Sequence, residues 1–226
     1  MNRIVPFCFA LISLTATAQS QIPTYDPNSP GAIEFRAKRD AFNADARKLD
    51  TLELYNEIAR LDSEKDSKRA LLTPNQLVSS LMAFTDDDFR SMEYEKVLKQ
   101  RGEGSDTEAA FFHGFHQWKT CLLYERQSST GTAKIAASCW QHDVMPFLKR
   151  ASAAGLPDAT SNIGKLYEAG LGVTPSKYAA AEWYLKSAEQ YNKRGYRDDA
   201  LTNLEKSLGL VPDLPAALRL RKALLK

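Results

Sequence analysis

Residues 153–188, AAGLPDATSNIGKLYEAGLGVTPSKYAAAEWYLKSA, predict two short helices that are joined by a glycine turn. Gly170 suits the left-handed position that ends a helix, and Gly172 allows a second unusual dihedral. Thr174 and Pro175 then predict the N-cap and the first residue of the next helix. Apolar residues recur at steps of three or four in the first helix, namely Ala159, Ile163, Leu166 and Tyr167. One such pair cannot bury its apolar faces alone, so helices before and after it are expected to stack on it.

This stretch resembles the Sel1-like repeat, a relative of the tetratricopeptide repeat. The resemblance rests on the glycine turn, on the aromatic pair of the second helix, and on the residues Ala159, Gly164, Leu166, Tyr167, Gly170, Gly172, Val173, Ala180, Trp183, Tyr184, Lys186 and Ala188. Beyond Ala188 the spacing resembles the tetratricopeptide repeat instead, through Tyr184, Ala188, Tyr191, Gly195, Ala200, Leu204, Ser207 and Pro212. A diverged earlier unit precedes them, in which Phe147-Leu148 aligns with Trp183-Tyr184.

The resemblance implies an all-α fold, a right-handed solenoid of helical hairpins over residues 106–226 that ends in a capping helix. A less regular helical region is expected over residues 31–105. Repeats of this kind bind a protein or peptide partner in a concave groove. The candidate binding residues are Asn162, Lys165, Tyr167, Tyr191 and Asn203, although core packing between repeats also accounts for Tyr167, Tyr191 and Trp183.

The first 18 residues have the form of a secretory signal peptide. A charged start at Arg3 is followed by the apolar run 4–14, and the small residues at 16–18 predict cleavage after Ala18. The apolar run is too short for a permanent membrane anchor, so no stable membrane insertion is expected after cleavage. Residues 19–30 hold three prolines and predict a flexible lead-in. The sequence therefore predicts a bacterial protein that is exported to the periplasm or secreted.

The composition argues against nucleic acid as a partner. Without residues 1–18 the chain carries 29 basic and 28 acidic residues, which are unevenly distributed. Residues 26–108 hold 13 basic and 18 acidic residues, whereas residues 171–226 hold 10 and 6. Neither block has the strongly basic composition of a nucleic-acid-binding domain.

Apolar periodicity and capping residues predict further helices in the N-terminal region. One amphipathic helix is expected from Gly31 to about Leu61, with a dimerising coiled coil as a less supported alternative. Another begins at Thr73, and Thr85 opens a third, whose first turn holds three aspartates. Acidic residues in a first turn favour the helix dipole, and no calcium-loop spacing follows them.

An aromatic-rich helix is expected from Ala109 to about Arg126, after a capping box at Ser105–Glu108. A second helix runs from about Thr132, with Pro146 bending or restarting it. The last helix is expected over Leu214–Lys226, with Asp213 as its N-cap.

The cysteines Cys121 and Cys139 predict a disulfide. A helical hairpin that turns at 127–131 brings them level, and an exported protein meets an oxidising compartment. Closing a loop of this length stabilises a fold by roughly 3 kcal/mol.

The three histidines His113, His116 and His142 flank these cysteines, so a metal site made by the five residues is an alternative. Against it, Cys121 lies about 140° round the helix from His116, because successive residues turn by 100°. We therefore interpret the three histidines as residues that lie at the surface or face a partner.

No sequence motif for a nucleophile with its base, for paired catalytic carboxylates or for a phosphate loop is found. The sequence thus favours a non-catalytic periplasmic scaffold or adaptor without a cofactor. A small envelope enzyme, such as a hydrolase, or a metal-binding protein that uses the histidine–cysteine cluster is the alternative. Self-assembly through the 31–61 helix is a third interpretation.

Overall fold

The structure, a computed structural model, describes residues 27–70, 85–126 and 132–225, and these ranges contain helices and loops but no strand. The expected all-α class is therefore confirmed. The chain divides into two compact units, residues 1–37 and 38–226, and the first is described only from residue 27. The expected signal peptide at 1–18 and the helix expected to begin at Thr73 lie outside the described residues.

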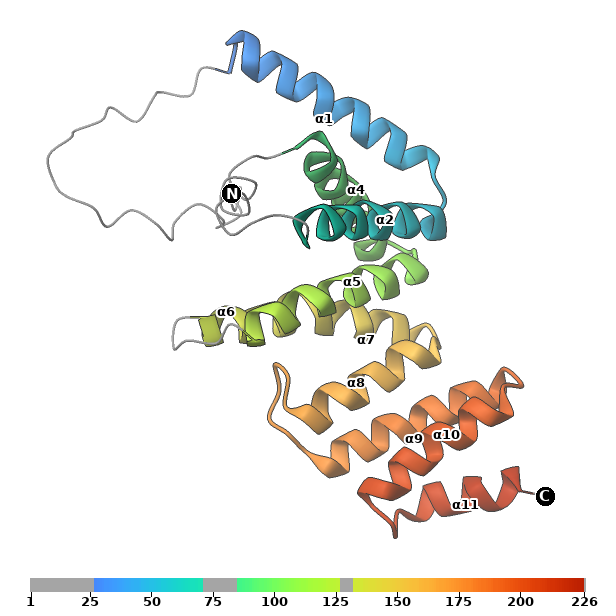
Figure 1. Ribbon diagram of the computed structural model, residues 1–226. Helices are drawn as coiled ribbons and strands as arrows, with labels where there is room; N and C mark the ends of the chain where they lie inside the picture. The colour runs from blue at the N-terminus through green and yellow to red at the C-terminus, as the bar shows by residue number, and fades with distance from the viewer. Residues whose placement is uncertain (1–26, 71–84, 127–131, 226) are drawn as a thin grey trace, which may run out of the picture. The chain divides into compact units, whose positions relative to one another are not determined.

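Figure 1 shows the helices in chain order from blue to red. Those before the disulfide hairpin are α1 (Pro30–Lys48), α2 (Thr51–Ala70) and α4 (Asp86–Glu103). The hairpin itself contains α5 (Thr107–Arg126), α6 (Thr132–Cys139), a short π-helix (Trp140–Val144) and α7 (Met145–Ala153). The remaining helices are α8 (Pro157–Ala169), α9 (Lys177–Lys193), α10 (Arg197–Leu210) and α11 (Pro215–Leu224). None of these described helices combines the length and the apolar character that crossing a membrane requires.

The expectation of one continuous helix from Gly31 to Leu61 is wrong. The chain leaves α1 after Lys48 and starts α2 at Thr51, with Asp50 as the N-cap. The Glu53 N–H donates to Asp50 Oδ1 at 2.8 Å, and the Asp50 N–H donates to Glu53 Oε2 at 2.9 Å. This reciprocal capping box satisfies two backbone donors at the new helix start, which favours a break where the apolar pattern alone continues.

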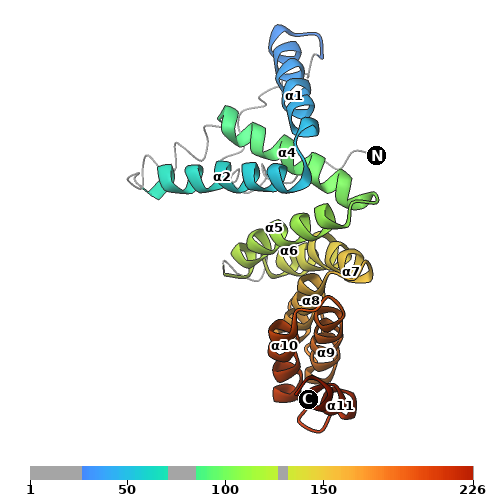
Figure 2. The same cartoon turned by 90° about the vertical axis from the view of Figure 1, so that its right-hand side faces the viewer.

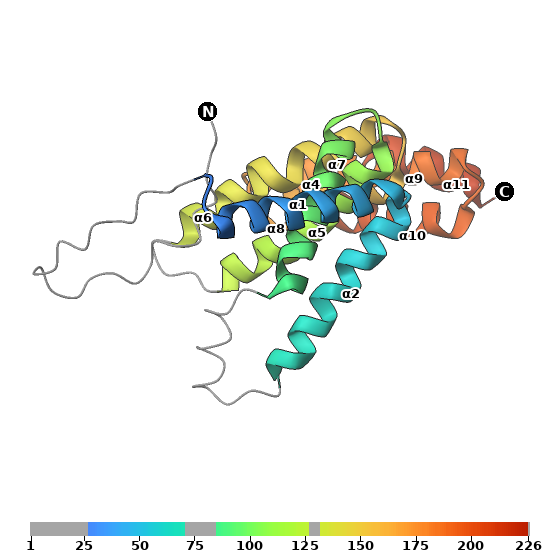
Figure 3. The same ribbon diagram turned by 90° about the horizontal axis from the view of Figure 1, so that it is seen from above.

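In the N-terminal part, α2 packs on α4, and α4 packs on α5. Figure 3 shows the last turns of α2 beside the first turns of α4. Leu54 and Ile58 of α2 and Leu98 of α4 are fully buried in the core between them. The backbones of α4 and α5 come close at Gly102, where an added Cβ would lie 2.8 Å from the Ala110 Cα.

The helix starts expected from the sequence are partly correct. Thr85 caps α4 in a capping box with Asp88, as expected. The cap of α5 is Asp106 rather than Ser105, because the Ala109 N–H donates to Asp106 Oδ1 at 2.9 Å. An aspartate carboxylate is a strong N-cap acceptor, so it takes the position that the sequence pattern assigned to the neighbouring serine.

Two further expected caps are also displaced by a residue or more. Helix α9 is capped by Ser176, whose Oγ accepts the Ala179 N–H at 3.2 Å, whereas Thr174 and Pro175 belong to the preceding turn. Helix α11 follows Leu214, which makes no side-chain capping bond, and begins at Pro215. Proline is favoured at a first helical position because it needs no partner for an N–H, and Asp213 is therefore not the N-cap.

Helices α7 to α11 pack in sequence order, each on the next (Figures 1 and 2). One core surrounds Trp140, Leu148 and Ile163, and a second surrounds Leu204 and Ala217. Gly164 lies against the ring of Tyr184, where an added Cβ would be 3.0 Å from Tyr184 Cδ1. The absence of a side chain at Gly164 therefore allows α8 and α9 to approach each other closely.

The glycine turn between α8 and α9 also has the expected conformation. Gly170 and Gly172 have φ values of 72° and 68°, which favour glycine over residues with a Cβ. An added Cβ at Gly172 would lie 2.3 Å from the Cβ of Trp140, and Gln141 Nε2 donates to the Gly172 carbonyl at 3.2 Å. The glycine turn therefore packs against the π-helix that precedes α7.

Pro146 lies in the first turn of α7, so it restarts the helix as expected. The π-helix before it is not predicted by the sequence pattern. There the Met145 N–H donates to the Trp140 carbonyl five residues earlier, a spacing that adds one residue to the turn.

Candidate functional site

All five candidate binding residues lie on α8, α9 and α10, and four of them, Asn162, Lys165, Tyr191 and Asn203, form hydrogen bonds on one face of these helices. The helices pack against one another in the order α8, α9, α10 (Figures 1 and 2). Together with three charged neighbours they define what we call the α8–α10 face, made by Asp158, Asn162, Lys165, Tyr191, Asp199, Asn203 and Lys206.

Ser161 and Asn203 join α8 to α10 at the base of this face. Ser161 Oγ donates to Asn203 Oδ1 at 2.8 Å, and Asn203 Nδ2 donates to the Asp199 carbonyl at 2.9 Å. Both residues are buried, so these bonds form away from water. The amide of Asn203 is therefore held in one orientation by the fold.

Two lysines occupy the same end of the face. Lys165 Nζ donates to Asn162 Oδ1 at 2.8 Å, and Lys206 Nζ lies 5.7 Å from the centre of the Tyr184 ring. Partial burial lowers the pKa of Lys165, the positive charge of Lys206 lowers it further, and the negative charge of Asp158 partly opposes both. The two ammonium groups therefore repel each other across the face, and in the described part of the chain neither lysine forms a salt bridge.

An acidic pair occupies the other end. The Tyr191 hydroxyl donates to Asp158 Oδ1 at 2.6 Å. Burial raises the pKa of Tyr191, and the hydrogen bond and negative charge of Asp158 raise it further, as does the charge of Asp199. Tyr191 therefore remains a neutral donor that ties α9 to the first turn of α8.

The structure does not bring Tyr167 to this face. At 100° per residue it lies nearly opposite Asn162 and Lys165 on α8, and it packs against the core around Trp140. Asn162 and Asn203 are only 8% and 5% exposed, so the lysines offer more accessible atoms than the asparagines. The role of all five residues in binding stays a prediction.

The sequence-based interpretation missed a polar pattern that the two outer helices share. Residues 158–165 read DATSNIGK and residues 199–206 read DALTNLEK, so Asp, Asn and Lys recur at an offset of 41 residues. In the structure these residues form the acidic end, the base and the basic end of the α8–α10 face. Aligning the polar positions of α8 and α10 would have found the pattern.

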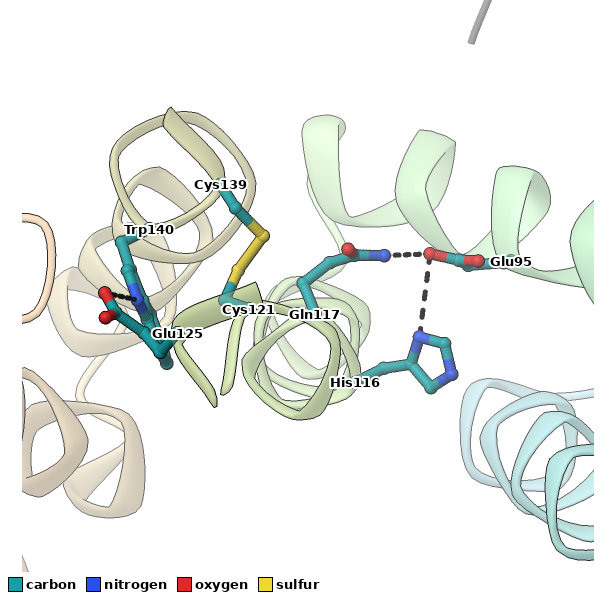
Figure 4. The surroundings of a disulfide bond; sticks show 7 residues. All are labelled: Glu95, His116, Gln117, Cys121, Glu125, Cys139 and Trp140. Atoms are coloured by element: carbon teal, nitrogen blue, oxygen red, sulfur yellow. Dashed lines mark hydrogen bonds and ion pairs between the residues drawn. A yellow bond between two sulfur atoms is a disulfide. The ribbon is translucent and has the colours of Figure 1, made fainter. Parts of the chain in front are cut away.

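The expected disulfide joins Cys121 of α5 to Cys139 of α6, with a Cα–Cα distance of 5.6 Å (Figure 4). Both cysteines are buried. Trp140 follows directly, and its Nε1 donates to Glu125 Oε1 at 3.2 Å. The bond thus fastens the start of the π-helix to α5.

His116 faces away from the disulfide and joins three helices. Its Nε2 is hydrogen-bonded to Asp62 Oδ2 of α2 at 2.8 Å, and its Nδ1 forms an ion pair with Glu95 Oε1 of α4 at 3.5 Å (Figure 4). Gln117 Nε2 also donates to Glu95. Burial alone would lower the pKa of His116, but the two carboxylates outweigh it and raise the pKa to about 9.

His113, one turn earlier, has the opposite environment. Its side chain is buried, with its ring 4.3 Å from the ring of Phe147, and neither ring nitrogen has a hydrogen-bond partner among the described residues. Burial lowers the pKa of His113 to about 4, so the ring is neutral near neutral pH. The expectation that the histidines lie at the surface is wrong for His113 and His116, because helix α5 is covered on both sides by other helices.

The alternative metal site is not assembled. The cysteines are bonded to each other, His116 is held by carboxylates, and His142 lies at the surface on the π-helix. Within residues 27–70, 85–126 and 132–225, no three histidine, cysteine or acidic residues are placed to hold a metal ion.

No protein-family model, curated protein or solved structure matches this chain. The function is therefore inferred from the residues and their geometry alone.

Proposed function

We propose that this protein is a non-catalytic scaffold or adaptor that binds a protein or peptide partner through the α8–α10 face. The observation that carries the proposal is the pair Lys165, hydrogen-bonded to Asn162, and Lys206, which lies over the Tyr184 ring. These two exposed cations repel each other at a surface held together from below by Ser161 and Asn203. An anionic group of a partner would relieve that repulsion, which makes an acidic partner segment the best fit.

The packing order supports a second part of the proposal, that α7 to α11 are Sel1-like and tetratricopeptide-like repeats arranged as a solenoid. Each helix packs on the next, and the glycine turn with its left-handed residues lies where such a hairpin needs it. Helix α11 would then be the capping helix of the array.

We also propose that residues 1–18 are a signal peptide and that the mature chain is periplasmic or secreted. The buried disulfide between Cys121 and Cys139 supports this, because such bonds persist in oxidising compartments and are rare in the cytosol.

Site-specific photo-cross-linking in living cells tests the binding proposal. A photoreactive amino acid is placed at Thr202, an exposed residue of α10 between Asp199 and Lys206, so that both lysines are kept. Matched controls carry the probe at Glu182 or Glu189, exposed residues on the opposite side of α9. We expect one recurrent protein product from Thr202 and none from the controls.

The same products from Thr202 and from both control positions, or no product from Thr202 in a normally folded protein, would refute the proposal. Mass spectrometry of the cross-linked band identifies the partner.

A further inference from the structure

The recurrence of Asp, Asn and Lys at an offset of 41 residues is only partly explained by packing. Between these residues the pattern also repeats Ala159 as Ala200 and Ile163 as Leu204, and all four are fully buried. Core positions recur because both helices pack on α9. The aspartates and lysines are exposed, so burial places no such demand on them.

Helix dipoles do not explain the lysines either. Asp158 and Asp199 lie in the first turns of α8 and α10, where a negative charge is favourable. Lys165 and Lys206, however, lie at least four residues before the ends of their helices, and the dipole effect fades beyond the last turn. Among the described residues the two lysines make different contacts, Lys165 with Asn162 Oδ1 and Lys206 with the Tyr184 ring, so no shared packing contact accounts for their repetition.

The geometry separates the charges into two ends. At the acidic end the Tyr191 hydroxyl donates to Asp158 Oδ1 at 2.6 Å. At the basic end Lys206 Nζ lies over the ring of Tyr184, and Gly164, the chain neighbour of Lys165, packs against the same ring. Seven residues of helix, roughly 10 Å at 1.5 Å per residue, separate the acidic end from the basic end on each helix. An extended peptide covers that distance with about three residues at 3.3 Å each.

We propose that the α8–α10 face selects a partner segment with separated charges: an acidic group over Lys165 and Lys206, and a basic group about three residues away over Asp158 and Asp199. This inference rests on the proposed function and specifies the partner at the same face. A segment with the same charges in alternating order cannot place both signs over their complements at once.

Three fluorescein-labelled heptapeptides test the inference by fluorescence anisotropy at low ionic strength. The first has two glutamates and two lysines at opposite ends of three uncharged residues, the second has the same residues with the charges alternating, and the third has glutamates at both ends. We expect the first to bind the full mature chain at least fivefold more tightly than the second, and added salt to remove the difference.

Two variants sharpen the test. Lys165→Gln with Lys206→Gln should weaken binding of the charge-separated peptide about fivefold or more and reduce its preference over the alternating peptide. Glu182→Gln with Glu189→Gln, on the opposite side of α9, removes two charges elsewhere and should leave both affinities unchanged. Circular dichroism confirms that each variant is folded.

Equal binding of the charge-separated and alternating peptides would overturn the inference, and so would tightest binding of the all-acidic peptide. Absence of binding by all three would also overturn it. Cross-linking from Thr202 reports occupancy of the face whatever the charge order. A recurrent cross-linked partner together with indifferent peptides would therefore reject the inference and leave the proposed function standing.

Discussion

Helices α2, α4 and α5 and helices α8, α9 and α10 are both three-helix assemblies, but they use charge in opposite ways. In the first, His116 is enclosed between Asp62 and Glu95, so the charges satisfy one another inside the packing. In the second, neutral groups such as Ser161 and Asn203 make the internal bonds, and the lysines remain at the surface. The first assembly therefore pairs opposite charges between its helices, whereas in the second Lys165 and Lys206 contact only neutral groups among the described residues, which is the feature on which the proposed recognition rests.

The largest expected effect concerns the hairpin between the two assemblies. Replacing Cys121→Ser and Cys139→Ser together should lower the free energy of unfolding by about 3 kcal/mol, because an 18-residue loop is no longer closed in the unfolded chain. Urea denaturation measures this. A loss below about 1 kcal/mol would mean that packing alone holds α6 on α5.

The pH dependence of stability should reflect His116 and His113 with opposite signs. The raised pKa of His116 gives a contribution that is complete below pH 6.5 and is lost as the pH rises through about 9. The lowered pKa of His113 gives a contribution to the free energy of unfolding that is fully present above pH 6.5 and is lost as the pH falls through about 4. Urea denaturation between pH 4 and 10 should therefore show maximal stability near pH 6.5 from this pair.

His116→Gln should flatten the alkaline side of that profile, and His113→Phe should flatten the acid side. An unchanged alkaline side in His116→Gln would show that other groups control it.

Removing one carboxylate from the cluster of Asp62, Glu95 and His116 should lower the free energy of unfolding by about 2 kcal/mol. Asp62→Asn removes one carboxylate from protonated His116, whose side chain is only 12% exposed. Because the side chain of Asp62 is itself 40% exposed, the expected loss in the free energy of unfolding is smaller than for a fully buried ion pair. Asp66→Asn, an exposed position on the same helix, is the control and should change little. Equal effects of the two would contradict the stabilising role of the cluster.

In the second assembly, loss of the hydrogen bond between Ser161 and Asn203 should lower the free energy of unfolding by about 1 kcal/mol. Ser161→Ala leaves the buried Asn203 Oδ1 without its donor. Thr202→Ala is the matched control, since Thr202 occupies the corresponding position of α10 and bonds the Asp198 carbonyl at an exposed site. Thermal denaturation compares the two, and a more damaging Thr202→Ala would show that the α8–α10 bond is unimportant.

The smallest effect on stability is expected from the lysines. Lys165→Gln should change the free energy of unfolding by less than about 0.5 kcal/mol, because it removes a repulsion with Lys206 along with one hydrogen bond at the surface. Yield of the cross-linked product, with the probe at Thr202, should nevertheless fall. A large loss of stability would assign the lysine to the fold rather than to recognition.

The features that the sequence predicted well are local. The glycine turn at Gly170 and Gly172 and the disulfide across one hairpin depend on residues within 20 positions of each other, so spacing and periodicity suffice. The bond between Asp62 and His116 spans 54 residues, and no spacing rule relates two positions on helices separated by a third. The break at Asp50 was missed because apolar periodicity continues through it while the capping box does not depend on that pattern.

For the candidate face, the structure brings together four of the five predicted residues, and their role in binding stays a prediction. The recurring Asp, Asn and Lys positions of α8 and α10 lie on one face of each helix, and they include Asn162, Lys165 and Asn203. Tyr167 follows the apolar stripe of α8 instead and packs against the core. Which side of α8 stays exposed depends on the packing of α7, α9 and α10 around it, and that packing is not visible in the helix alone.

The position of Trp140 has an optical consequence. It contacts Trp118 edge to face, with ring centres 5.1 Å apart, and it adjoins both the disulfide and Gly172. Two of the three tryptophans of the chain thus lie at a single junction, where α5, the disulfide, the π-helix and the glycine turn meet. Intrinsic fluorescence should therefore reveal the opening of that junction specifically, with an emission change on reduction of the disulfide while the far helices remain folded.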